Sequence, residues 1–251
     1  MLHRGVLLAG ILGFGLSFSL AAFAGDTPAY VRSAIADPSR TADVQADARR
    51  HPADLATFAG VKPGDTVVDL IPGGGYFTRI FSKIVGPKGH VYAVWPNEYA
   101  NEAADDVTAT KAMTAQYKNV SVIVQPAAQF GIPTKADVVW TSQNYHDYPD
   151  KFMGKVDPVS FDRQVFASLK PGGVFVIVDH VAEQGSGMRD TDTLHRIDPA
   201  IVKTQVTSAG FKFDGESSVL RNPADTHKAT VFDKSIRGHT DQFAYRFRKP
   251  R

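Results

Sequence analysis

Three short segments of the chain place histidine beside aspartate, a combination that suits proton transfer. They are His146-Asp147, Asp179-His180 and the stretch from His195 to Asp198. An unperturbed histidine titrates near neutral pH, so it can take a proton from a hydroxyl or an amine, and a carboxylate can orient its ring. These segments are therefore the first candidates for acid–base chemistry.

The same residues also suit structural roles. His180 and His195 can be hydrogen-bonded residues at strand ends, and Arg196 can pair with Asp179 or Asp198. Asp198 stands directly before a proline, which is typical of a helix N-cap. A metal site is a further alternative, but tight ligand spacing such as H-E-x-x-H is absent, so we expect no metal.

A second region joins an apolar run to a glycine-dense turn, in the sequence VVDLIPGGGYFT that ends at Thr78. Glycine can adopt positive φ and lets a ligand approach the backbone, and a helix that follows would present free N–H groups. The dinucleotide pattern G-x-G-x-x-G fails at Thr78, and the phosphate-binding pattern G-x-x-x-x-G-K-[ST] is absent. What remains is an acid, Asp69, followed by Gly73 and Gly75.

Strand-like and helix-like segments alternate along the chain, which predicts a doubly wound, mostly parallel α/β sheet. The two last extended segments have no helix between them, so we expect an antiparallel hairpin at the end. Strands are expected over Thr66–Leu70, Val91–Trp95, Val120–Val124, Asp137–Thr141, Val174–Val178, Phe211–Arg221 and Gln242–Phe247. Helices are expected over Ala42–Arg50, Pro52–Ala59, Phe77–Val85 and Glu98–Tyr117, and from Pro158 and Pro199 onward.

Ligands of such sheets lie beyond the carboxyl ends of the strands, where the strand order reverses. The glycine turn, the segment Thr141–Tyr148 after the fourth strand and Asp179-His180 after the fifth all belong to this edge. The topology, rather than the sequence spacing, therefore predicts that the turn and the histidines share one site.

The glycine segment resembles motif I of the class I S-adenosylmethionine-dependent methyltransferases, an acid-x-Gly-x-Gly-x-Gly pattern in which Ile71 takes the first glycine position. LKPGGVFVIVDH, AGFKF and DQFAYRFRKP resemble later strands of that family, and the resemblance covers about Asp43 to Arg251. With QNYHD and LHRID, the chain looks most like an exported branch of predicted methyltransferases. The resemblance implies a seven-stranded Rossmann-like sheet and S-adenosylmethionine as cofactor.

For the cofactor, the resemblance implies that Asp69 orients the turn near the methionine amino group. The acid that usually ends the second strand and binds the ribose is missing. Glu98 could replace it, or Trp95 could stack on the adenine. The cofactor-binding candidates are Asp69, Pro72, Gly73, Gly74, Gly75, Tyr76, Trp95, Glu98 and Asn144.

For the transfer itself, the protein must hold an acceptor in line with an activated methyl group and exclude water. The loop after the fourth strand flanks this methyl group in the family, so His146 is the expected base and Asp147 its orienting partner. The substrate-binding candidates are Tyr145, His180, His195 and Arg196. The expected function is methyl transfer to a small molecule or an exposed protein group.

The N-terminus predicts export to the periplasm or beyond the cell. Met1–Arg4 is basic, Gly5–Ala21 is apolar, and Ala22-Phe23-Ala24 fits a cleavage site. We therefore expect a signal peptide over residues 1–24, with an uncleaved anchor as the alternative. A helical extension over 25–60 and an α/β domain over 61–251 would follow, with no stable membrane insertion after cleavage.

Composition narrows the remaining classes. The formal net charge of +2 gives no reason to expect nucleic acid as a partner. The absence of cysteine excludes disulfides, thiol nucleophiles and zinc–thiolate sites. Two alternatives stay open beside the methyltransferase: a non-catalytic exported protein that binds a small molecule on the same fold, and a metal-dependent hydrolase.

Overall fold

The computed structural model describes residues 26–251. The predicted signal peptide, residues 1–24, lies outside this range. Among the described residues, no helix combines the length and the apolar character needed to span a membrane.

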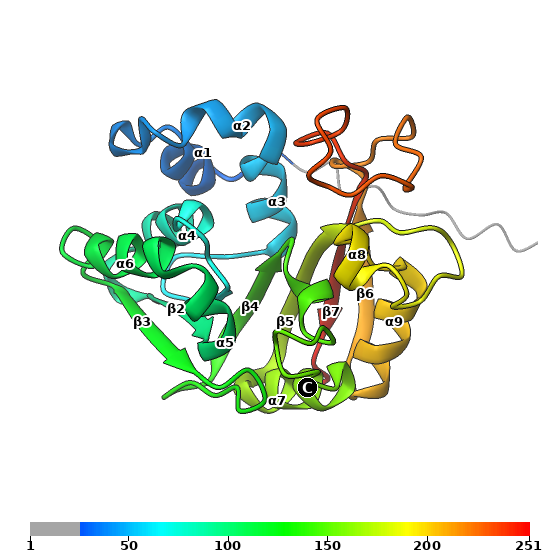
Figure 1. The fold of residues 1–251 in the computed structure, drawn as a ribbon. Helices are drawn as coiled ribbons and strands as arrows, with labels where there is room; N and C mark the ends of the chain where they lie inside the picture. Colours follow the sequence, from blue (N-terminus) through cyan, green and yellow to red (C-terminus); the bar gives the residue numbers. More distant parts are fainter. Residues whose placement is uncertain (1–25) are drawn as a thin grey trace, which may run out of the picture.

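Within residues 26–251, seven strands form one sheet in the order β3-β2-β1-β4-β5-β7-β6 (Figure 1). The first five strands pair in parallel, and β7 runs antiparallel between β5 and β6. This confirms the predicted fold class and the antiparallel end. The strands are β1 (Thr66–Leu70), β2 (His90–Pro96), β3 (Val120–Gln125), β4 (Ala136–Ser142), β5 (Leu169–His180), β6 (Lys212–Ser217) and β7 (Gln242–Arg248).

The helices follow the predicted alternation with two differences. The segment Glu98–Tyr117, expected as one helix, forms two helices because Ala103 leaves helical geometry at φ −119° and ψ 41°. A short helix, α8, was not predicted. The helices are α1 (Ala29–Ile35), α2 (Val44–Arg50), α3 (Pro52–Ala59), α4 (Tyr76–Val85), α5 (Asn97–Glu102), α6 (Ala104–Met113), α7 (Pro158–Ser168), α8 (Thr191–Leu194) and α9 (Pro199–Ser208).

Alternating apolar residues give the sheet a hydrophobic core on each face, because successive side chains of a strand point to opposite sides. In β5, Val176 packs with the core under α1, α3 and α4, whereas Phe175 and Ile177 pack with the core under α7 and α9. All three side chains are fully buried. The two helical layers therefore fix the sheet from both sides and hold its carboxyl edge in place.

The N-terminal helices dock onto α4 through charged contacts. Asp43 accepts two hydrogen bonds of 2.6 Å from the guanidinium of Arg79, a bidentate geometry that is strong and directional. Asp47 accepts from Arg40 at 2.7 Å and from the hydroxyl of Tyr76 at 2.5 Å. Because Tyr76 begins α4, these contacts place the end of α2 over the glycine turn.

Asp69, near the end of β1, is buried and accepts a hydrogen bond of 2.6 Å from the Thr78 hydroxyl in α4. Burial raises the pKa of the Asp69 carboxyl from 3.8 to about 7. The folded protein therefore binds this proton more tightly than the unfolded chain does. Between pH 3.8 and about pH 7, the contribution of Asp69 to the free energy of unfolding therefore falls as the pH rises.

We predict that Asp69→Asn removes this pH-dependent loss. Between pH 5 and pH 8, the wild type should lose stability as the Asp69 carboxyl ionises, whereas the variant should not. The free energy of unfolding of the variant should therefore rise relative to that of the wild type. The change should be on the order of a few kcal/mol, because one pKa unit corresponds to about 1.4 kcal/mol. Urea unfolding at both pH values measures it.

Any new cost of the amide is independent of pH, so it shifts both measurements equally. The control is Thr78→Val, which removes the hydroxyl donor that favours the ionised carboxylate and should extend the loss to higher pH. An Asp69→Asn difference that stays constant with pH would contradict the buried, proton-binding carboxyl.

Candidate active site

A cleft of about 470 Å³ opens at the carboxyl edge of the sheet, where β1 and β4 lie side by side and the strand order reverses. Five parts of the chain line it: the end of α2, the glycine turn, the α5–α6 junction, the segment after β4 and the histidine-bearing loops. The lining residues include Arg50, Ile71, Pro72, Gly73, Glu102, Asp106, Asn144, His146, Asp147, His180, His195 and Phe232. The glycine turn and the histidines therefore line the same cleft, as the topology predicted.

The three consecutive glycines have different roles. Gly73 lines the cleft with φ +55°, and a Cβ added there would have no atom within 4 Å, so the turn leaves an open seat. Gly75 has φ +80°, and a Cβ there would lie 2.7 Å from the sulfur of Met113 in α6. Gly75 therefore serves close packing, and neither it nor Gly74 or Tyr76 lines the cleft.

Ile71 takes the first glycine position of the motif with φ +51°, a left-handed conformation that is unusual for a β-branched residue. Asn144 holds it by donating through Nδ2 to the Ile71 carbonyl at 3.1 Å and the Ser142 carbonyl at 2.7 Å. Gln143 and His195 also line the cleft with positive φ. Such backbone persists where surrounding contacts enforce it, and it is common at ligand sites.

His146 lies in a 3₁₀ turn after β4, and its ring is held between two carboxylates. Its Nδ1 lies 2.8 Å from Asp179 Oδ1, and its Nε2 lies 3.2 Å from Asp147 Oδ1. Although burial opposes the charged form, these carboxylates raise the pKa of His146 well above its usual value. Asp179, rather than Asp147 alone, therefore orients the ring.

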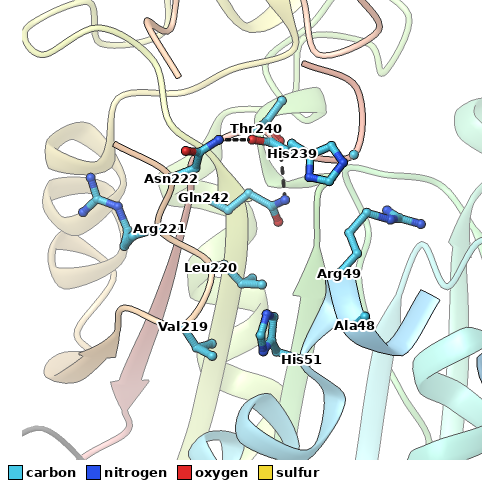
Figure 2. A pocket seen from close by; sticks show the side chains of 11 residues that line it. Ala48, Arg49, His51, Val219, Leu220, Arg221, Asn222, His239, Thr240 and Gln242 are labelled. Atoms are coloured by element: carbon cyan, nitrogen blue, oxygen red, sulfur yellow. Dashed lines mark hydrogen bonds between the residues drawn. The ribbon is translucent and has the colours of Figure 1, made fainter. Parts of the chain in front are cut away.

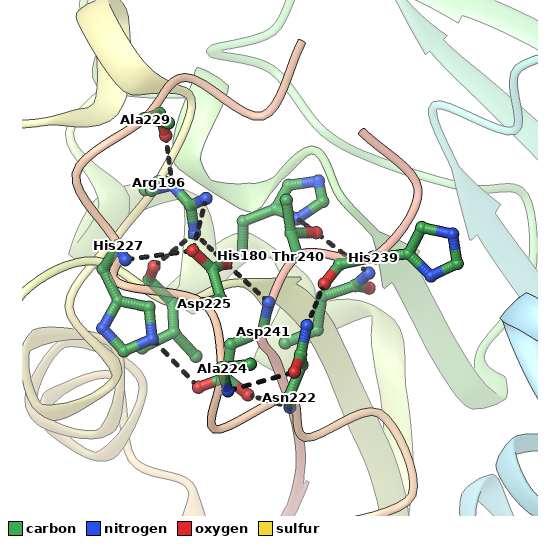
Figure 3. Close-up of polar contacts among 12 residues, drawn as sticks. His180, Arg196, Asn222, Ala224, Asp225, His227, Ala229, His239, Thr240 and Asp241 are labelled. Atoms are coloured by element: carbon green, nitrogen blue, oxygen red, sulfur yellow. Dashed lines mark hydrogen bonds and ion pairs between the residues drawn. The ribbon is translucent and has the colours of Figure 1, made fainter. Parts of the chain in front are cut away.

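The other two histidines have distinct environments. His195 Nδ1 lies 3.4 Å from His146 Nε2 and 3.7 Å from Asp147 Oδ1, so these three atoms face one point. His180 turns its Nδ1 to the Thr240 hydroxyl at 2.7 Å, as Figure 3 shows. Burial lowers the pKa of His180 to about 4, so its ring is neutral at pH 7.

Three further cofactor-binding candidates, Trp95, Glu98 and Asp69, do not line the cleft either. Trp95 is fully buried in the core with its ring centre 6.0 Å from that of Tyr99, so no face is free to stack on an adenine. Glu98 accepts a hydrogen bond of 2.9 Å from the Ala127 backbone and does not line the cleft. Asp69 accepts a hydrogen bond from Thr78 in α4 and does not line the cleft.

Two of the expected substrate contacts are likewise structural. Arg196 is fully buried and pairs with Asp225 at 2.9 Å, not with Asp179 or Asp198. Tyr145 is fully buried and donates its hydroxyl to Asp162 at 2.9 Å. Asp198 caps α9 by accepting from the Ala200 backbone at 2.9 Å, the structural role given as its alternative.

Three charged residues that sequence reasoning missed line the cleft. Arg50, at the end of α2, faces the glycine turn with its guanidinium 4.8 Å from the ring centre of Tyr76. Glu102 and Asp106 stand on either side of the break between α5 and α6. Because one continuous helix was predicted here, the two acids were not recognised as lining a cleft. Nothing in the sequence indicated that the N-terminal helices would reach the glycine turn.

These residues fit S-adenosylmethionine. The cation of Arg50 suits the methionine carboxylate, and the open seat at Gly73 admits the methionine backbone. Glu102 and Asp106 supply carboxylate acceptors for ribose hydroxyls, which the end of β2 lacks. The cleft volume lies within the range of about 300–1,000 Å³ that is usual for small-molecule sites.

A second cavity of about 410 Å³ lies between α2 and the segment from Val219 to Gln242 (Figure 2). Four of its lining side chains are arginine or histidine: Arg49, His51, Arg221 and His239. A narrow gap lies between this cavity and the cleft. It is lined by residues of both, among them Arg50 of the cleft and Gln242 of the second cavity. Figure 3 shows the polar network of Arg196, Asp225 and Asp241 that holds this segment.

Comparison with family models identifies the family of the chain. A family model described as "Methyltransferase domain" matches residues 61–225. The ubiquinone/menaquinone biosynthesis C-methyltransferases of Ectopseudomonas mendocina and Vibrio cholerae are 26% and 27% identical over 74% and 73% of the chain. The chain spans 63% and 62% of the length of these relatives. The structure of an S-adenosylmethionine-dependent methyltransferase from Aquifex aeolicus is similar in fold, with a TM-score of 0.53 and 20% identity over 87% of this chain and 96% of that one.

We predict that Gly73→Val weakens binding of S-adenosylmethionine by at least about tenfold, because a branched side chain would fill the open seat. The matched control is Gly60→Val at the end of α3. Gly60 has φ +73° and also has no atom within 4 Å of an added Cβ, but it does not line the cleft. Calorimetric titration of both variants measures the affinities.

Both variants place a β-branched residue at positive φ, so equal backbone strain is built into the comparison. Gly75→Val should instead lower the melting temperature, because its side chain would meet Met113. Equal affinities for the Gly73 and Gly60 variants would show that the turn is not the contact.

Proposed function

The chain belongs to the methyltransferase domain family, and from this premise we propose that it transfers the methyl group of S-adenosylmethionine to a nucleophilic atom of a small molecule or an exposed protein group. One observation carries the proposal: a single cleft joins the open turn at Gly73 to the carboxylate-held ring of His146. The two sides of this cleft differ in chemistry, as a donor and an acceptor site must.

On the donor side, the protein's task is to bind and orient. Arg50 would hold the methionine carboxylate, the Gly73 backbone would lie against the methionine chain, and Glu102 with Asp106 would accept from the ribose. When bound, S-adenosylmethionine supplies an activated methyl carbon, so no further activation of the donor is needed. Asn144 fixes the turn relative to the end of β4 and thereby sets the distance to the acceptor.

On the acceptor side, His146, Asp147, His180 and His195 form a polar wall, and the exposed Phe232 lines the cleft beside them. The ring centre of Phe232 lies 4.8 Å from that of His195. A proton that leaves an acceptor hydroxyl or amine meets titratable groups at hydrogen-bond distance from one another.

The central prediction is that the protein binds S-adenosylmethionine with one site per chain and that His146→Ala leaves this affinity within about twofold. Turnover should fall by about 100-fold or more, because the histidine acts on the acceptor and not on the donor. Calorimetry measures binding, and release of S-adenosylhomocysteine over a panel of hydroxyl, amine, thiol and carbon acceptors measures turnover.

Absence of binding at millimolar S-adenosylmethionine would defeat the proposed function. Tight binding with no acceptor-dependent release would favour the alternative, a non-catalytic binding protein on the same fold. Parallel loss of affinity and turnover in His146→Ala would assign His146 to the donor side and contradict its role.

We further propose that the protein acts outside the cytosol, as the basic start, apolar run and cleavage pattern of residues 1–24 predict. The mature chain should then begin at Gly25. Intact-mass measurement of the protein recovered from the host's periplasm and medium checks this cleavage. A full-length mass in the cytosolic fraction alone would contradict export.

A further inference from the structure

Three ligand-type atoms, two from consecutive residues after β4 and one from the end of α8, converge on one side of the cleft. They are His146 Nε2, Asp147 Oδ1 and His195 Nδ1. Their separations are 3.2 Å from His146 to Asp147, 3.4 Å between the two histidines and 3.7 Å from His195 to Asp147. Tetrahedral coordination with bonds of about 2.0–2.2 Å places ligand atoms roughly 3.3–3.6 Å apart. The triangle is therefore already close to the size that one metal ion demands.

We propose that these three atoms bind a divalent transition-metal ion, with Zn²⁺ the best fit, and leave one coordination position open to the cleft. Two imidazole nitrogens and one carboxylate oxygen are a donor set that Zn²⁺ accepts in sites with an open position. The sequence predicted no metal because no tight ligand motif is present. The fold supplies the third ligand instead, from the end of α8.

The surroundings of His146 have the form expected around a metal ligand. Metal-bound histidines usually donate their other ring nitrogen to a carboxylate, which fixes the ring and its tautomer. In this protein the carboxylate is Asp179, whose Oδ1 lies 2.8 Å from His146 Nδ1. Asp179 is itself fixed, because it also accepts from the backbone of His146 at 2.9 Å and of His180 at 2.8 Å.

The exposure of the ligands leaves a path for the ion. The side chains of His146 and Asp147 are 3% and 4% exposed, whereas that of His195 is 31% exposed. His195 is held in place by its left-handed backbone, φ +54°, and by its N–H bond to the Thr191 carbonyl at 3.1 Å. An ion can therefore enter on the His195 side and meet ligands that need little rearrangement.

Charge favours the same conclusion. Asp147 and Asp179 place two carboxylates around one imidazole in a site with almost no exposed surface. Buried charges are costly unless they are paired or bound to a metal. A divalent cation at the three atoms would balance the charge of both carboxylates.

The role of the ion rests on the proposed function. A hydroxyl or thiol acceptor at the open position would lose its proton to solvent more readily, because a bound metal stabilises the anion. Its electron pair then forms the bond to the methyl carbon, and the pair of the broken carbon–sulfur bond stays with sulfur. The proposal thus selects acceptors that carry an oxygen or sulfur able to bind a metal.

The test is metal binding by the chelator-treated protein, measured with Zn²⁺ and with Co²⁺, whose visible spectrum reports four-coordination. We expect one ion per chain, intense Co²⁺ bands, and their loss on addition of Zn²⁺. His195→Ala should weaken Zn²⁺ binding by more than about 100-fold, and Asp179→Asn by about 10–100-fold. His195 is partly exposed, so its variant should keep the fold.

The matched control is His227→Ala. His227 is 25% exposed and pairs with Asp241 at 3.1 Å, so it copies a histidine–carboxylate pair outside the cleft (Figure 3). It should leave Zn²⁺ affinity unchanged. No stoichiometric binding by the wild type, or equal affinities for the His195 and His227 variants, would overturn the proposal.

Titration with S-adenosylmethionine in the same samples separates the two proposals. Metal binding without cofactor binding would defeat the proposed function and leave the metal site standing. Cofactor binding without metal binding would do the reverse.

Discussion

The carboxylate of Asp179 is the contact on which the site depends. Asp179 lies one residue before the end of β5, and its carboxylate reaches across to the segment after β4, where it binds both the backbone and the ring of His146. The neighbouring strands are parallel, so their ends would lie together in any case. Together with Asp147, this side chain converts that proximity into one fixed ring orientation. Because Asp179 is fully buried, water cannot compete for its oxygens.

The donor side depends on a different part of the chain. The bidentate pair of Asp43 and Arg79 holds the N-terminal helices on α4, and this brings Arg50 to the glycine turn. The helical extension is therefore part of the cleft wall as well as a cover for the sheet. The cleft has two supports, a polar one at β5 and an ionic one at α4, and neither shares a residue with the other.

The sequence was sufficient for elements whose pattern is local. The strand Thr66–Leu70 and the helix Pro52–Ala59 were predicted with the bounds observed, because a proline, a glycine and an apolar run marked their ends. The edge that carries the histidines also followed from the alternation of elements. These features depend on periodicity and on turn chemistry, which a single sequence displays.

Side-chain direction was the part that the sequence could not supply. Trp95 was expected to face a ligand, but its place in β2 turns it into the core. Arg196 follows His195 directly, yet one residue lines the cleft and the other pairs with Asp225 behind it. Arg50 reaches the cleft only because the N-terminal helices dock onto α4. Such outcomes depend on which face a backbone presents and on partners far away in sequence.

The segment that carries Phe232 has a wider consequence. It is anchored from behind by the buried pair of Arg196 and Asp225 and joined to α8 by the Val231 N–H, so its exposed tip can vary while its base stays fixed. The glycine turn and Arg50 lie on other parts of the chain. Under the proposed function, relatives of this protein could therefore diverge in what they modify while the recognition of the common donor is inherited unchanged.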